Sequence, residues 1–357
     1  MGDIHLTVGP TQLHPAAVEA YQHGITDGVA SISHRSDDYM LIHRETTSQL
    51  RRLFDLPDSV HIFFLGSGTE AMERLIAGTV ISKSFHLVNG AFSKKWFSIA
   101  HKLGKTPSSY EVGFAEGFSG RTITPPSDAE LICVTQNETS TGVYTGDTVI
   151  RQLREHRPDA LIAVDAVSAA PCYPLDFSFI DAAFFSVQKG FGLPAGLGVL
   201  MCDDRMLDKV RSRDDGCCIG SYHSLLSLEA KAKKDQTPTT PNVLAIHALG
   251  KVAKKLADKG MSSLHDETKQ KARMLYEALE SRGFRIFPAN DRSSTIIVAE
   301  VADPDTIRKV LAEQGVNVSK GYGPYKGNHV RIANYPQHTL KDIRSLISAL
   351  NAVNRDK

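Results

Sequence analysis

Three short apolar runs between residues 160 and 201 limit the possible folds of this chain more than any other feature. They cover residues 160–164, 182–187 and 198–201. Continuous apolar runs of this length are typical of strands that are covered on both faces of a sheet. Asp165 follows the first run, and Lys189 comes two residues after the second. Because ligands bind outside the carboxyl ends of strands in open α/β sheets, Asp165 and Lys189 are predicted to share one site.

An acid and an amine at neighbouring strand ends suit pyridoxal phosphate. This cofactor needs a lysine to hold its aldehyde and an acid to keep its ring nitrogen protonated. The alternative is that Asp165 caps the following turn and that Lys189 is a solvated loop residue. The cofactor hypothesis is favoured because small residues leave room beside the amine, at Gly190, Gly192, Ala195 and Gly196.

A strand-to-helix junction earlier in the chain predicts an anion site. The apolar run 60–65 leads through a small-residue turn into a helix with apolar residues on one face. Free N–H groups and the positive end of the helix dipole face such a turn. Ser67, Gly68 and Thr69 are the candidate phosphate donors, and simple capping of the helix by Thr69 is the alternative. The turn lacks the glycine spacing of a dinucleotide-binding loop.

The order of the predicted elements indicates an α/β fold with two domains. Strands alternate with helices up to about residue 240, as in a largely parallel, doubly wound sheet. From about residue 262 the pattern changes to a small α+β domain. We therefore predict a large domain at residues 1–250 and a small C-terminal domain at residues 251–357.

Composition excludes several classes of protein. The formal net charge of +1 gives no electrostatic reason for a nucleic-acid partner, and no run of about 18 apolar residues predicts a membrane span. The five cysteines show no C-x-x-C spacing, and Cys217 and Cys218 are adjacent. An odd, sparse set of cysteines is typical of reduced thiols, and no signal peptide is visible, so we expect a cytoplasmic protein.

Six segments together give the chain a resemblance to a known family: VDAVSA, SVQKGFG, GSGTEAME, NGAFSKKW, QNETSTGV and VRIANYP. The chain resembles the class V pyridoxal-phosphate-dependent aminotransferases of fold type I, over nearly its whole length. The resemblance implies a mainly parallel sheet of the seven-stranded type in the large domain, with the N-terminal segment across the active site. It also implies pyridoxal 5'-phosphate, no metal, small amino acid and 2-oxo acid substrates, and a homodimer with shared active sites.

The resemblance also implies a role for each candidate site residue. Lys189 is expected to hold the cofactor and to move the substrate proton, while Asp165 keeps the ring nitrogen protonated. Phe92 is expected to stack on the ring, although its spacing alone favours a core residue. Arg331 lies in an apolar strand and is expected to bind the substrate carboxylate, with an internal salt bridge as the alternative. The other expected cofactor contacts are Ser67, Gly68, Thr69, Thr139, Gln188 and, across the dimer interface, Thr239 and Thr240, for which a plain linker is the alternative.

The substrate is predicted from fewer residues. His34 and Arg35, with Lys326, are candidates for binding a phosphate, which favours the phosphoserine branch of the family; a surface Arg35 beside a helix cap at Ser36 is the alternative. That branch usually has a His-Arg pair before the carboxylate arginine, and here the stretch reads GPYKGNH. Since NETSTGV and NGAFSKKW are closer to the alanine–glyoxylate and serine–pyruvate branch, a transaminase of unphosphorylated amino acids stays open. A lyase or desulfurase on the same scaffold and a binding protein that keeps the fold are further alternatives.

Overall fold

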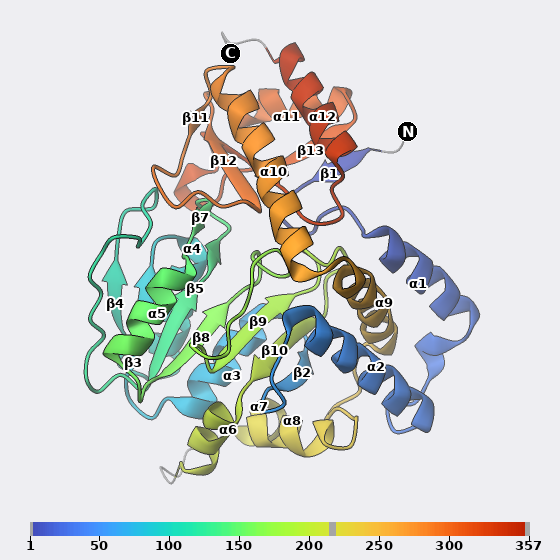
Figure 1. Cartoon of the computed structure of the whole chain (residues 1–357), viewed down its shortest axis with the longest axis vertical. Coiled ribbons are helices and arrows are strands. Elements are labelled where there is room, and N and C mark those ends of the chain that lie inside the picture. The colour runs from blue at the N-terminus through green and yellow to red at the C-terminus, as the bar shows by residue number, and fades with distance from the viewer. Residues whose placement is uncertain (1–2, 214–218, 354–357) are drawn as a thin grey trace.

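The computed structural model describes residues 3–213 and 219–353, and helices pack around its two larger sheets (Figure 1). A seven-stranded sheet forms the larger part, and a five-stranded sheet lies at the end of the molecule near both termini. Cys133, Cys172 and Cys202 are buried free thiols, whereas Cys217 and Cys218 fall outside the described residues. No helix in the described ranges is both long and apolar enough to cross a membrane.

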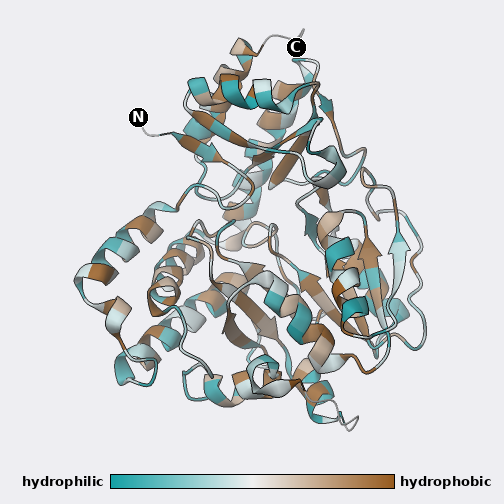
Figure 2. Cartoon of the chain, turned by 180° about the vertical axis from the view of Figure 1, so that it is seen from behind, coloured by the Kyte–Doolittle hydropathy of each residue, from teal (hydrophilic) through white to brown (hydrophobic). Residues whose placement is uncertain are grey.

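The large sheet is mainly parallel, as predicted. Its strands in spatial order are β2 (His61–Leu65), β10 (Gly198–Cys202), β9 (Ala182–Ser186), β8 (Leu161–Asp165), β5 (Leu131–Thr135), β3 (Ser84–Val88) and β4 (Ser108–Glu111). The strands from β9 to β4 pair in parallel, while β10 is antiparallel to both β2 and β9. Figure 2 shows the hydrophobic colour concentrated on the inner strands of this sheet, whereas the edge strand β4 is polar. Every residue of β3, β5, β8, β9 and β10 is buried, because helices cover both faces.

Successive residues of each strand enter two separate hydrophobic cores. In β5, Leu131 and Cys133 join one core, whereas Ile132 and Val134 join the other. This alternation follows from the two-residue period of a strand. The first core is covered by α3 (Gly68–Thr79), α4 (Ala91–Lys102), α6 (Asp204–Arg211) and α8 (Leu225–Ala232). The second is covered by α1 (Pro15–Thr26), α2 (Asp37–Phe54), α5 (Asp147–His156) and α9 (Val243–Lys259).

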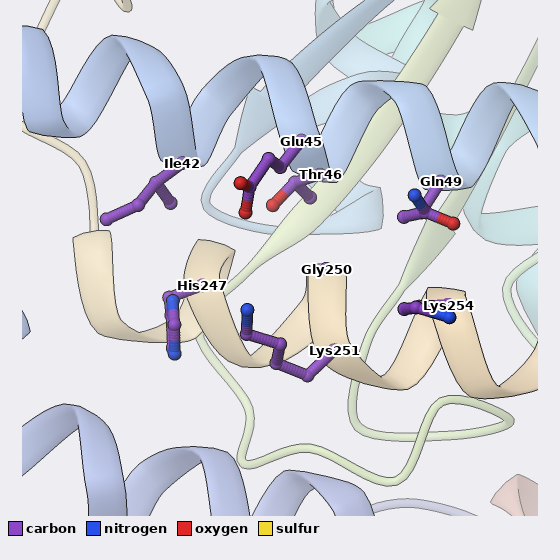
Figure 3. Close-up of a pocket in the computed structure, with 8 residues that line it drawn as sticks. All are labelled: Ile42, Glu45, Thr46, Gln49, His247, Gly250, Lys251 and Lys254. Atoms are coloured by element: carbon purple, nitrogen blue, oxygen red, sulfur yellow. The ribbon is translucent and has the colours of Figure 1, made fainter.

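Helices α2 and α9 pack closely side by side. A Cβ atom at Gly250 would lie 2.5 Å from Thr46 Oγ1, so this approach requires glycine. The Thr46 hydroxyl donates a 3.0 Å hydrogen bond to the carbonyl of Ile246 across the contact. Figure 3 shows the surface recess of about 290 Å³ beside it, into which charged side chains from both helices extend. Its lining contains none of the predicted site residues.

The small sheet has the order β1 (Ile4–Leu6), β13 (Val316–Lys320), β14 (His329–Ala333), β12 (Ile296–Glu300) and β11 (Arg285–Ile286). Helices α10 (Met261–Glu280), α11 (Pro304–Glu313) and α12 (Leu340–Ala349) supply apolar side chains to its core. The predicted small α+β region is thus present. Its extent differs from the sequence prediction at one point, because β1 pairs in parallel with the edge of β13. The proposed division at residue 250 falls inside α9.

The remaining short elements lie in the connections. They are η1 (Val29–Ser31), β6 (Asn137–Glu138), β7 (Val143–Tyr144), α7 (Gly220–His223), η2 (Gly323–Tyr325) and η3 (Leu350–Ala352). β6 and β7 form a two-stranded hairpin directly after β5. This hairpin places a run of polar residues at the carboxyl edge of the large sheet.

Candidate active site

Asp165 and Lys189 lie at the carboxyl ends of two neighbouring parallel strands. Asp165 is the last residue of β8 and pairs with Phe184 of β9. Lys189 follows β9 by three positions, and both side chains are buried. Asp165 Oδ1 accepts a 2.9 Å hydrogen bond from the backbone N–H of Val167. Lys189 Nζ donates to the carbonyl of Val8 at 3.1 Å. The structure therefore brings together the two strand ends that the sequence pairs.

Burial moves the pKa values of these two groups toward neutrality. It raises the pKa of Asp165 to about 7, and the nearby Glu138 carboxylate acts in the same direction. Burial also lowers the pKa of Lys189 to about 8, assisted by the positive charge of Arg331. A low dielectric environment penalises the charged form of any group. A lysine with this pKa is partly neutral near neutral pH, so a fraction of the molecules carries the free amine that a nucleophile or general base requires.

Glu138 fixes the start of α4, which carries Phe92. Its buried carboxylate accepts hydrogen bonds from the backbone N–H groups of Phe92 and Ser93 and from the hydroxyls of Ser93 and Ser140. An anion at this position is favoured by the helix dipole. Phe92 is thereby held with its ring centroid 5.7 Å from Lys189 Nζ. The ring is in place to pack against a group bound at the amine.

A hydroxyl pair lies beside Lys189. Thr139 Oγ1 is 3.4 Å from Lys189 Nζ and donates a 2.8 Å hydrogen bond to Ser168 Oγ. Ser168 Oγ also accepts from the side chain of Asn137 and donates to its carbonyl, so its hydrogen-bonding capacity is filled. Ser168 has no predicted role. Its position three residues after Asp165 was the available signal.

The amino end of α3 is capped by Ser67, and the predicted alternative of a cap at Thr69 is wrong. Ser67 Oγ accepts a hydrogen bond from the N–H of Glu70, and the N–H of Gly68 donates to Ser186 Oγ. Thr69 Oγ1 instead accepts a 2.8 Å hydrogen bond from Lys95 Nζ. The N–H of Thr69 has no acceptor in the described part of the chain.

Arg331 approaches the same site from the small sheet. Its Nε donates to the carbonyl of Lys320 at 2.8 Å, and Nη1 donates to the carbonyl of Thr139 at 3.1 Å. Burial lowers the pKa of Arg331 to about 10. Within residues 3–213 and 219–353 no carboxylate forms an ion pair with it, so the alternative of an internal salt bridge is not observed there. A buried guanidinium without an anionic partner suits a ligand carboxylate.

The residues predicted to bind the distal phosphate of the substrate contact other parts of the chain or are exposed. Arg35 donates hydrogen bonds to Gln236 Oε1 and to the carbonyls of Thr237 and Pro238, while Ser36 caps α2. Lys326 is exposed after η2. Among the described residues, neither Arg35 nor Lys326 contacts Lys189, Asp165 or Arg331, and the same holds for His34. The substrate roles of these residues stay predictions.

Thr239, Thr240 and Gln188 are also predicted cofactor contacts, and their side chains make no hydrogen bond to another described residue of the site. Thr239 and Thr240 are exposed and line a recess of about 180 Å³ together with Gly66 and Gly196. Gln188 is half-buried beside Lys189, and within the described ranges its side chain makes no hydrogen bond. These side chains are free to meet a ligand or a second subunit.

Three further side chains of the site, for which the sequence predicts no role, come from segments distant from Lys189 in the chain. Gln337 Nε2 donates to the carbonyls of Lys189 and Gln12, at 2.9 and 3.2 Å. The hydroxyl of Tyr335 donates to the carbonyl of Val8 at 3.3 Å. The ring of Tyr322 lies 5.1 Å from that of Phe92 and 5.4 Å from the Arg331 guanidinium. Only Tyr335, in the segment VRIANYP, had a sequence signal.

The chemistry of these groups fits pyridoxal phosphate. Asp165 Oδ2 has no hydrogen-bond partner in the part of the chain that the structure describes, so it can receive a protonated ring nitrogen. Lys189 provides an amine for the aldehyde, Phe92 an aromatic face, and the amino end of α3 an anion site. Each requirement of the cofactor is met by a residue at one edge of the large sheet.

Comparison with known proteins assigns the chain to a family. The family model for class-V aminotransferases matches residues 121–346, which is more than half of the chain. The chain belongs to the class V aminotransferase family. As a class V aminotransferase it is a transaminase and uses pyridoxal phosphate, which agrees with the buried lysine and acid.

Relatives of this class V aminotransferase extend over its full length. A crystal structure of a phosphoserine aminotransferase from Cytophaga hutchinsonii is 39% identical, covers 98% of each chain and superposes with a TM-score of 0.95. The phosphoserine aminotransferase of Corynebacterium glutamicum is 28% identical, over 99% of this chain and 94% of its own. An alanine–glyoxylate aminotransferase structure from Nostoc, 21% identical over 99% of this chain and 96% of its own, shares the fold with a TM-score of 0.84.

Proposed function

We propose that this class V aminotransferase acts on phosphoserine. The reaction transfers the amino group of phosphoserine to 2-oxoglutarate and gives 3-phosphohydroxypyruvate and glutamate. One observation carries the proposal: the 39% identical relative from Cytophaga hutchinsonii, a phosphoserine aminotransferase, matches this chain from end to end. The buried lysine, acid and arginine at the sheet edge supply the groups that transamination requires.

Each residue of the site has a separate role in the reaction. Bound pyridoxal phosphate supplies an electron-accepting ring that makes the substrate Cα–H bond acidic. Lys189 Nζ, with its lowered pKa, takes up the proton at Cα as general base and later returns one as general acid. Asp165 holds the proton on the ring nitrogen. Arg331 binds the substrate carboxylate and thereby fixes the orientation of the Cα–H bond.

The cofactor contacts follow from the positions of the other polar groups. Ser67, Gly68, Thr69 and Gln188 are proposed to surround its phosphate, Thr139 to bind its ring hydroxyl or phosphate, and Phe92 to stack on its ring. Support comes from the uncapped N–H of Thr69 and from the fixed start of α4. The Gly68 N–H is already engaged by Ser186, so this donor must be shared or released.

The distal phosphate of the substrate needs cationic partners, and His34, Arg35 and Lys326 are the proposed ones. Arg35 holds its guanidinium on the 236–238 loop of its own chain. That loop leads directly to Thr239 and Thr240, which are exposed. We infer that the loop and Arg35 act as one unit, in a homodimer whose active sites are shared between subunits. A cytoplasmic location stays a prediction from the cysteine usage.

A transaminase of small unphosphorylated amino acids is the second candidate. It is favoured by the aromatic surroundings of Arg331, where Tyr322 lies over the guanidinium and Lys326 is exposed. An unphosphorylated side chain needs no further cation there. The two candidates therefore differ in whether a second cation reaches the substrate.

A panel of donors and acceptors tests the proposal. Phosphoserine with 2-oxoglutarate is compared with alanine or serine with glyoxylate, by the ratio of kcat/KM values. We expect phosphoserine to be preferred, and Lys189→Ala to reduce the turnover of every donor by about 100- to 10,000-fold. A preference for alanine or serine would establish the second candidate, and no turnover of any donor by a protein that binds the cofactor would refute transamination.

A further inference from the structure

Lys95 has a position that none of the expected roles explains. It lies in the first turns of α4, three residues after Phe92, so both side chains emerge on one side of the helix. Its Nζ crosses to α3 and donates a 2.8 Å hydrogen bond to Thr69 Oγ1. The partner is a neutral hydroxyl, and Lys95 forms no ion pair with a carboxylate anywhere in residues 3–213 or 219–353. The ammonium charge is therefore not balanced by the protein residues described.

The positive charge of Lys95 lies beside the positive end of a helix dipole. The first turn of α3 carries the positive end of a helix dipole, and the N–H of Thr69 is without an acceptor among the described residues. An ammonium group beside the amino end of a helix is repelled, since cations are favoured at the opposite end. A bound dianion converts this repulsion into attraction from both sides. The arrangement is consistent with a ligand phosphate at this position.

The cationic residue of α3, Arg74, is not available for binding a ligand phosphate. Arg74 is the cationic residue nearest in sequence to Thr69, and it is held by Glu70 Oε1 through Nε and Nη2, at 2.8 and 2.6 Å. Glu70 in turn accepts from the N–H of Gly66. Arg74 is thus balanced by a carboxylate one helical turn away, whereas Lys95 is not. Lys95 also acts on Asp165, whose pKa its charge lowers slightly against the larger effect of burial.

We propose that Lys95 binds the phosphate of the cofactor, with Thr69 holding the ammonium in place. This inference rests on the proposed cofactor site and adds a residue to it. α4 then contributes twice to cofactor binding, through the Phe92 ring and through a cation one turn further along. Lys95 supplies the positive charge that the uncharged side chains of Ser67 and Thr69 lack.

The test measures cofactor affinity in Lys95→Met, which keeps the length of the side chain and removes its charge. The neighbouring exposed Lys94 is the matched control, as Lys94→Met, because its side chain makes no hydrogen bond or ion pair within the described ranges. The full-length protein is freed of cofactor and titrated with pyridoxal phosphate and, separately, with pyridoxal, which has no phosphate. Binding is followed by absorbance and protein fluorescence.

Lys95 is exposed, like Lys94. Loss of its charge-assisted hydrogen bond is expected to raise the Kd of pyridoxal phosphate about five- to thirtyfold in Lys95→Met. The Kd of pyridoxal should stay unchanged, Lys94→Met should match the parent, and Lys95→Arg should recover most of the affinity. The difference between Lys95→Met and the parent should shrink as salt is added.

Two results would overturn the inference. One is an equal loss for pyridoxal and pyridoxal phosphate, which would mean that Lys95 only ties α4 to α3. The other is equal behaviour of Lys95→Met and Lys94→Met. Failure of the parent protein to bind pyridoxal phosphate would instead refute the proposed cofactor site, so the two failures are distinguishable.

Discussion

The pKa of Lys189 depends on three charged neighbours as well as on burial. Arg331 lowers its pKa, whereas Asp165 and Glu138 raise it. The balance keeps the pKa at about 8, so the amine is mainly protonated below that pH and mainly neutral above it. The reactivity of Lys189 should therefore change within the physiological range and respond to substitutions of its neighbours.

Removing the charge of Arg331 should raise the pKa of Lys189 from about 8 toward the ordinary lysine value, because a repelling cation is lost. In Arg331→Met, labelling of Lys189 by an amine reagent should need a higher pH than in the parent. The measurement is a pH series on cofactor-free protein, read by peptide mass spectrometry. Arg344→Met is the control, since Arg344 is exposed and its side chain makes no hydrogen bond or ion pair among the described residues. An unchanged or lowered midpoint would contradict the expected coupling.

Lys189→Ala should reduce turnover by about 100- to 10,000-fold, because the group that moves the Cα proton is removed. Borohydride reduction of the parent protein with its cofactor, followed by peptide mapping, should label Lys189. Lys95→Ala should keep the label on Lys189. A label on another lysine would refute the assignment.

Asp165→Asn keeps the shape of the side chain and removes the charge that holds a proton on the ring nitrogen. We expect kcat to fall far more than cofactor content, by an order of magnitude or more. Asp159→Asn, at an exposed position, should have no effect. Near-normal kcat in Asp165→Asn would show that another group protonates the ring.

At the residue scale, the sequence predicts those site residues that follow an apolar strand directly. Asp165 and Lys189 are examples, because the strand pattern itself places their side chains at one edge. Partners that come from distant segments leave no local pattern. Gln337 reaches the carbonyl of Lys189 from 148 positions further along the chain, and no periodicity marks such a contact.

At the scale of elements, the start of α4 depends on close packing between Gly90 and Glu138. A Cβ atom at residue 90 would lie 2.3 Å from Glu138 Cγ, so Gly90→Ala must displace the carboxylate that holds α4. We expect a loss of about 1–3 kcal/mol in the free energy of unfolding, together with weaker cofactor binding. Urea denaturation and cofactor titration measure the two effects.

The control for this change is Gly327→Ala, because a Cβ atom there meets nothing within 4 Å and the backbone is not left-handed. It should leave both stability and cofactor affinity near the parent values. If Gly90→Ala behaved in the same way, the packing of Gly90 against Glu138 would not control the start of α4.

Most elements begin and end close to where the sequence predicts them. The sequence pattern predicts a helix over about residues 147–156 and another helix that ends before Pro57, and α5 (Asp147–His156) and α2 agree with these predictions. These elements have strong periodicity and clear stop signals. For Glu138, in the polar run that follows an apolar strand, the sequence predicts only a role in shaping the loop. Its bonds to Phe92 and Ser93 span 45 positions or more, so tertiary packing rather than local sequence gives it a role.

At the scale of the whole molecule, the proposed dimer predicts recovery of activity in mixtures of two inactive variants. Lys189→Ala lacks the amine, and the double change Thr239→Asp with Thr240→Asp places negative charges where a phosphate would approach. In a mixed dimer, one site combines an intact Lys189 with an intact loop from the other subunit. Random mixing should restore about a quarter of the parent activity, because half of the dimers carry one complete site of two.

The measurement is activity after the two variants are unfolded and refolded together. Refolding each variant alone is the control and should give no activity. Recovery is absent if the loop serves the site of its own chain, where it lines a recess with Gly66 and Gly196. Sedimentation of the parent as an active monomer would also contradict the dimer.

The α/β fold, with a large and mainly parallel sheet, followed from the order of strands and helices along the chain. The exception is β1, whose three residues carry too short a pattern to reveal a partner. β1 joins a sheet formed by the opposite end of the chain, and sequence order favours neighbours instead. Its placement depends on the open edge of β13, which only the folded molecule shows.

The pairing of β1 has a consequence for the synthesis of the chain. Ile4 leaves the ribosome 312 residues before Val316, with which it pairs (316 − 4 = 312). β1 therefore has no strand to join until almost all of the chain has been translated. Because Val8, which contacts Lys189, lies in the segment directly after β1, the surroundings of the Lys189 amine are completed equally late. A nascent chain that stops before residue 316 consequently lacks this contact and Arg331, and its release gives no partly active enzyme.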